Sequence, residues 1–168
     1  MLNVALSYAL VIVTLSLTHV TLTMAIGRNE RHLWIYTAGF AFSTACFLLY
    51  TFQASVGQFI GIIFSNLLLI LFHLFMVWGI RSFYSLQPAW PRRFWAYSAV
   101  YVAAMTTLTY AVSVFSLRAA LTSAFIVIIV LEFLKTLVRY SYDTLNAIRY
   151  QVIACFSLCA VFHAVRCA

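Results

Sequence analysis

Long uncharged stretches separated by short polar segments dominate this sequence. The clearest runs from Phe59 to Ile80, carries no formal charge and is followed directly by Arg81. At about 1.5 Å per residue, a helix of this length extends roughly 33 Å, whereas the hydrocarbon core of a bilayer is about 30 Å thick. This stretch is therefore predicted to be a membrane-spanning helix, with Trp78 and Arg81 at the lipid interface.

The same pattern recurs along the chain and predicts an all-α, polytopic transmembrane helix bundle. The apolar stretches are continuous rather than alternating, which favours helices over the strands of a barrel. Pro88 and Pro91 are expected to end regular structure in the longest connection. We treat residues 1–168 as one transmembrane domain with six predicted spans, at about 2–26, 33–55, 59–80, 94–115, 119–138 and 147–165.

Composition excludes a water-soluble fold. Hydrophobic residues make up 65% of the chain and charged residues 8%, whereas soluble domains carry about 25% charged residues. The net charge is +7, but the cations lie at the ends of predicted spans and form no continuous basic run. This arrangement indicates contact with the lipid bilayer and its anionic headgroups, and we expect no nucleic-acid partner.

Lysine and arginine are divided unequally between the two ends of the predicted bundle. Arg118 and Arg166 lie at one end, and the other end holds Arg28, Arg31, Arg81, Arg92, Arg93, Lys135, Arg139 and Arg149. Cytoplasmic loops carry the excess of cations, so the N-terminus is predicted to lie outside the cytoplasm. With six spans the C-terminus would lie there too, and a seventh span would return the chain to the cytoplasm.

Five short motifs follow one another in order along the chain. They are Asn29-Glu30-Arg31-His32-Leu33-Trp34-Ile35-Tyr36 with Ala38-Gly39-Phe40, Asn66-Leu67-Leu68, Gly79-Ile80-Arg81-Ser82-Phe83, Arg118 and Arg166. Together they resemble the N-terminal multi-span membrane region of bacterial GGDEF diguanylate cyclases. In that family a seventh helix and a cytoplasmic cyclase domain follow the sixth helix.

The resemblance implies a sensory, signal-input domain of a cyclic-di-GMP signalling protein. It implies a place in the bacterial inner membrane, with a periplasmic N-terminus and a homodimer formed through the output domain. The chain contains no GG[D/E]EF sequence, so the catalytic residues of a cyclase would not lie on it. We therefore expect no catalytic residue, cofactor or metal here, and a small molecule or a protein as the ligand.

Four polar residues are the candidate ligand contacts: Asn66, His73, Arg118 and Arg166. Asn66 and His73 are seven residues apart and so share nearly one helix face. The alternative for Asn66 is a hydrogen bond between helices. The alternative for the two arginines is that their side chains reach out to lipid headgroups.

Three further residues carry weaker hypotheses. Glu132 and Lys135 have the i, i+3 spacing of an ion pair on one helix. His19 and His73 are predicted to lie at similar membrane depth, the geometry that a bis-histidine haem would need, and the alternative for both is hydrogen bonding between helices. Two other functions therefore stay open: a small six-span transporter or channel, and a haem or quinone redox protein.

Overall fold

The computed structural model describes residues 4–52, 55–57, 59–86, 90–112 and 115–140. The elements are α1 (Val4–Arg28), α2 (Arg31–Thr51), α3 (Ser65–Phe83), α4 (Trp90–Thr107) and α5 (Phe115–Tyr140), with π-helical η1 (Phe59–Phe64) before α3 and η2 (Leu108–Val112) after α4. Every element in these ranges is a helix, which confirms the predicted all-α class for the described chain.

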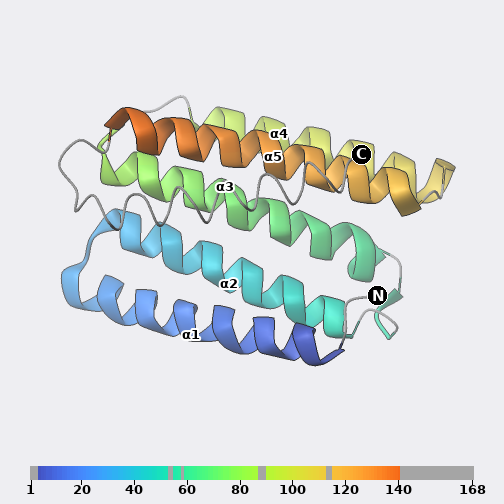
Figure 1. Ribbon diagram of the computed structural model, residues 1–168, viewed down its shortest axis with the longest axis horizontal. Helices are drawn as coiled ribbons and strands as arrows, with labels where there is room; N and C mark the ends of the chain where they lie inside the picture. The colour runs from blue at the N-terminus through green and yellow to red at the C-terminus, as the bar shows by residue number, and fades with distance from the viewer. Residues whose placement is uncertain (1–3, 53–54, 58, 87–89, 113–114, 141–168) are drawn as a thin grey trace.

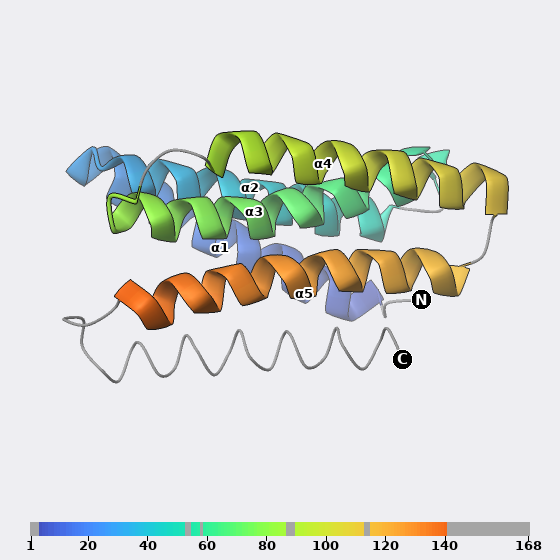
Figure 2. The same cartoon turned by 90° about the horizontal axis from the view of Figure 1, so that it is seen from above.

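The helices lie side by side in a bundle (Figures 1 and 2). α1 packs against α2, and α2 packs against α3. α3 also contacts α4 and α5, which makes it the central helix of the described bundle. The central position of α3 is also visible in its burial, because the apolar side chains of Ile70, Leu74 and Val77 are almost completely buried.

Within the described residues, four helical segments are long and apolar enough to cross a membrane: Tyr8–Arg28, Arg31–Thr51, Phe59–Phe83 and Ser116–Tyr140. They correspond to the first, second, third and fifth predicted spans, and they make this a membrane protein. The fourth predicted span is helical as α4 and η2 but is not among these four, because α4 is richer in polar and interfacial side chains. The sixth, 147–165, lies outside the described residues.

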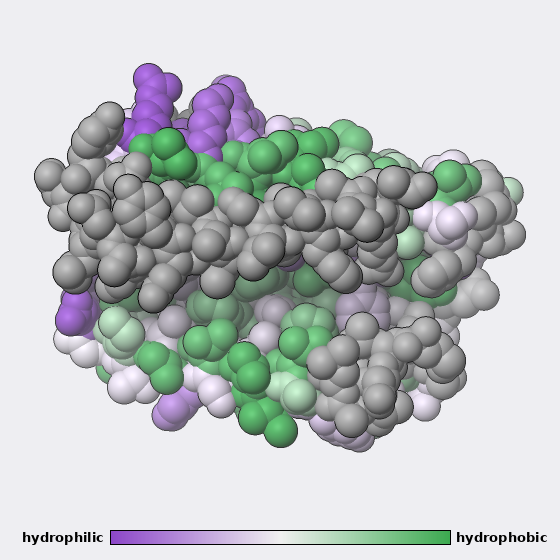
Figure 3. All heavy atoms as spheres, viewed as in Figure 1, coloured by the Kyte–Doolittle hydropathy of each residue, from purple (hydrophilic) through white to green (hydrophobic). Residues whose placement is uncertain are grey.

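All described cations except Arg118 gather at one end of the bundle, where α1, α3 and α5 end and α2 and α4 begin (Figure 1). Figure 3 shows strongly hydrophilic side chains at the left of the molecule, the same end in that view. We call this the basic end; its cations are Arg28, Arg31, Arg81, Arg92, Arg93, Lys135 and Arg139. Arg118 lies near the start of α5, at the opposite end, as its place in the sequence predicts.

All five α-helices extend further into the basic end than the sequence predicts, and α3 and α1 show how they end there. α3 passes Ile80 and ends at Phe83, because an arginine at the interface does not interrupt backbone hydrogen bonding. A Schellman motif then stops it: the Leu86 N–H donates to the Arg81 carbonyl at 2.9 Å, and Ser85 adopts φ 53°. α1 likewise ends only where Asn29, at φ 50°, turns the chain.

The prediction for Pro91 is wrong. α4 begins at Trp90, so Pro91 lies in its first turn rather than in an irregular connection. Proline is well tolerated there, because the first turn of a helix does not use its own backbone N–H groups. Pro88 lies outside the described residues.

Candidate functional site

The contact between α2 and α3 depends on two glycines that face large side chains of the partner helix. A Cβ atom on Gly79 would collide with the ring of Tyr36, and one on Gly39 would lie 2.7 Å from Cε of Met76. Each glycine therefore makes room for a bulky residue of the other helix, a close approach that small residues allow in membranes. Both glycines belong to the motifs that carry the family resemblance. The close contacts with Tyr36 and Met76 are a sufficient reason for a glycine at each position.

Asn66 joins α3 to α2 through a hydrogen bond. The Tyr50 hydroxyl donates to Asn66 Oδ1 at 2.6 Å, and Asn66 Nδ2 donates to the Ile62 carbonyl at 2.7 Å. The side-chain oxygen of Asn66 thus accepts a hydrogen bond from the neighbouring helix, and its nitrogen donates one to the preceding turn of its own segment. The interhelical role considered for Asn66 is confirmed, whereas ligand binding by Asn66 stays a prediction.

The residues around Asn66 lie where a π-helix changes into an α-helix. η1 ends at Phe64 and α3 begins at Ser65. Such a change of backbone pattern tends to leave a carbonyl without a backbone N–H, and buried carbonyls require a donor. Ser65 Oγ donates to the Gly61 carbonyl at 2.8 Å, as Asn66 does to Ile62. Short π-helical segments occur often at functional sites, which makes this junction a candidate site.

His73 lies two turns further along α3 and is buried at 6% exposure. Its Nδ1 is 2.8 Å from the Leu69 carbonyl, and a carbonyl can only accept, so the proton of that hydrogen bond is on Nδ1. Two helical turns correspond to about 11 Å along the axis, so the two side chains lie at different levels of the bundle, and ligand binding by His73 stays a prediction. Sharing a helix face has not brought them together.

Arg118 is half-buried near the start of α5, at the same end of the bundle as Asn66. Its Nε is buried and has no hydrogen-bond partner among the described residues. One turn further along α5, the Thr122 hydroxyl donates to the Arg118 carbonyl at 3.0 Å and lies 2.9 Å from the Tyr101 hydroxyl. Because Thr122 has one hydroxyl proton, Tyr101 is the donor to Thr122, and this bond ties α4 to α5 beneath Arg118.

The structure does not bring His19 and His73 together. His19 is exposed on α1, His73 is buried on α3, and α2 lies between the two helices (Figure 1). A haem held by this pair of imidazoles would need a different arrangement of the helices. No group of three or more metal-ligating side chains occurs within the described part of the chain.

Of the remaining candidates, the structure describes Glu132 and Lys135, and Arg166 lies outside the described residues. Glu132 is half-buried and Lys135 is exposed on α5, and in the described ranges no salt bridge joins them, so their pairing stays a prediction. A polar contact that sequence reasoning missed joins His32 Nε2 to Glu30 Oε2 at 3.1 Å, and it is a salt bridge when the imidazole is protonated.

Comparisons with protein-family models, curated proteins and solved structures returned no match for this chain. The resemblance to the membrane region of GGDEF cyclases therefore rests on the five motifs alone.

Tyr50 is the functional candidate that the sequence did not indicate. Its position near the end of a predicted span was visible, but nothing in the sequence shows which helix lies opposite Asn66.

Proposed function

We propose that this chain is the membrane-embedded signal-input domain of a cyclic-di-GMP signalling protein. The proposal includes six spans, a bacterial inner-membrane location and a basic end in the cytoplasm. The ordered motifs support it, as does the accumulation of described cations at one end of the bundle. In this proposal the opposite end, with Asn66 and Arg118, faces the periplasm and receives the signal.

The hydrogen bond between Tyr50 and Asn66 is the observation that best supports a sensory role. It couples α2 to the π-to-α junction of the central helix, and π-helical turns occur often at functional sites. A ligand that competes for the Asn66 amide would break the hydrogen bond from Tyr50 and so weaken the contact between α2 and this junction. A signal passes only if the ligand prefers one of the two helix packings.

Removal of the Tyr50 hydroxyl tests this role in the intact native gene. We expect Tyr50→Phe to change cellular cyclic-di-GMP, measured by mass spectrometry, by between about threefold and about twentyfold, the range set by the free energy of interhelical hydrogen bonds in membranes. Tyr110→Phe is the matched control, because Tyr110 is 60% exposed on η2 and loses the same single hydroxyl. An unchanged cyclic-di-GMP concentration in both variants would contradict the proposal, as would a native gene without a cyclase domain.

A further inference from the structure

An open groove of about 430 Å³ lies between α2 and α3 at the basic end. Its apolar wall includes Trp34 and Ala38 of α2 and Phe75 and Trp78 of α3. The small side chain of Ala38 keeps the groove hollow, and Phe75 is held in place by ring contacts, with centroids 5.2 Å from Phe42 and 5.3 Å from Phe94. The apolar wall of the groove is therefore mainly aromatic, and Phe75 belongs to a wider cluster of packed rings.

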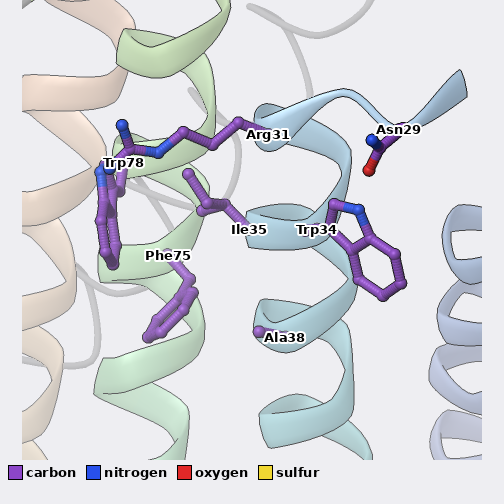
Figure 4. Close-up of a pocket in the computed structure, with 7 residues that line it drawn as sticks. All are labelled: Asn29, Arg31, Trp34, Ile35, Ala38, Phe75 and Trp78. Atoms are coloured by element: carbon purple, nitrogen blue, oxygen red, sulfur yellow. The ribbon is translucent and has the colours of Figure 1, made fainter. Parts of the chain in front are cut away.

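Polar groups stand at the mouth of the groove. Arg31 and Asn29 line it and are exposed, and in Figure 4 the Arg31 side chain extends from α2 toward Trp78 on α3. Glu30, next to Arg31 in the sequence, is not among the lining residues, and its carboxylate lies 3.1 Å from His32. The mouth thus offers a guanidinium and a side-chain amide, both able to donate hydrogen bonds to an anion.

The polar and apolar parts are stacked along the membrane normal. From Arg31 to Ala38 the α2 helix rises roughly 10 Å, so the wall continues from the level of the headgroups into the hydrocarbon. Trp34 and Trp78 lie between these levels, where tryptophan is enriched in membrane proteins. A lipid has the same order of groups: a charged phosphate above an apolar chain.

We propose that this groove binds an anionic phospholipid, with its phosphate at Arg31 and one acyl chain over Phe75 and Trp78. The basic pocket between helices at the cation-rich end matches the chemistry by which such sites hold acidic headgroups. Charge favours this occupant over a second copy of the chain, because another basic end would bring cations against Arg31. The site is independent of the signalling role proposed above.

Quenching of tryptophan fluorescence by brominated lipids tests the proposal in nanodiscs. Trp90→Phe and Trp95→Phe restrict the signal to Trp34 and Trp78, the two tryptophans of the groove. We expect brominated phosphatidylglycerol to occupy the groove about fivefold more tightly than brominated phosphatidylcholine at equal mole fraction, the preference that one arginine near an anionic surface provides. Arg31→Gln should abolish this preference.

Arg139→Gln is the matched control, because Arg139 is an exposed cation at the basic end that does not line the groove. It should leave the preference intact. Ala38→Leu fills the groove without changing charge and should reduce quenching by both lipids. Equal quenching by both lipids in the parent protein would overturn the proposal, as would equal effects of Arg31→Gln and Arg139→Gln.

Two other occupants give distinct results that would also overturn the proposal. If inorganic phosphate, added without change of ionic strength, removes the preference, the site recognises free phosphate. If neither brominated lipid quenches and cross-linking yields a dimer, a second copy of the chain covers the groove. Circular dichroism of each variant establishes that the helices remain folded in every comparison.

Discussion

Replacement of Gly79 by alanine is expected to lower the melting temperature of the purified protein by roughly 3–10 °C. The added methyl group would collide with the ring of Tyr36, which is wedged between α2 and α3. Overpacking of a well-packed interior costs about 1–3 kcal/mol, which corresponds to this range for a chain of this size. Thermal unfolding followed by circular dichroism in detergent measures the shift.

Gly27→Ala is the control for this substitution. Nothing lies within 4 Å of a Cβ atom at Gly27, which is also within a helix. Alanine there should raise stability slightly, because it has the higher helix propensity. In a Tyr36→Ala background the cost of Gly79→Ala should nearly vanish, since the ring that it strikes is gone. Equal stability changes at Gly79 and Gly27 would contradict the close contact.

Replacement of Tyr101 by alanine is expected to have an equal or larger effect, about 3–5 kcal/mol. Tyr101 is completely buried, packs edge to face on Phe125 at 5.2 Å, and donates its hydroxyl to Thr122. Alanine would remove the ring contacts that join α4 to α5, and dispersion contacts are what hold helices together in lipid. The free energy of unfolding in mixed micelles measures the loss.

Tyr110→Ala provides the comparison, since this tyrosine of η2 is 60% exposed. Its replacement should change the free energy of unfolding by less than about 0.5 kcal/mol, as is usual for surface positions. Tyr101→Phe should cost only about 1 kcal/mol, the hydrogen bond alone. If Tyr101→Ala and Tyr110→Ala were equally tolerated, the packing of α4 on α5 described above would be incorrect.

Apolar run length predicted most of the fold because the bilayer fixes how long a spanning helix must be. Within the described residues, the core of each run was therefore located well, whereas its ends were not: a charge at the interface, such as Arg81, ends the hydrocarbon segment but not the helix. The π-helical turns of η1 were not predictable, because a stretch that is apolar on every face shows no periodicity. In α1, the hydroxyls of Thr14 and Thr21 donate to carbonyls of their own helix, which satisfies them without a partner helix.

The candidate site was predicted only in part. Asn66 was recognised because an amide in lipid requires a partner, but the partner, Tyr50, depends on which helices are neighbours. The same limit applies to His19 and His73, since equal depth in the membrane does not make two residues adjacent. The glycines of the resemblance proved to be packing positions.

The orientation of the bundle is the central claim, because the periplasmic signal site of the proposed function depends on it. Labelling with a membrane-impermeant maleimide tests it directly, with Asn29→Cys and Ser55→Cys introduced singly into a chain whose native cysteines are replaced. Both positions are exposed, at opposite ends of α2. The account predicts that Ser55→Cys is labelled in intact cells and Asn29→Cys only after lysis. Labelling of Asn29→Cys but not Ser55→Cys in intact cells would contradict it.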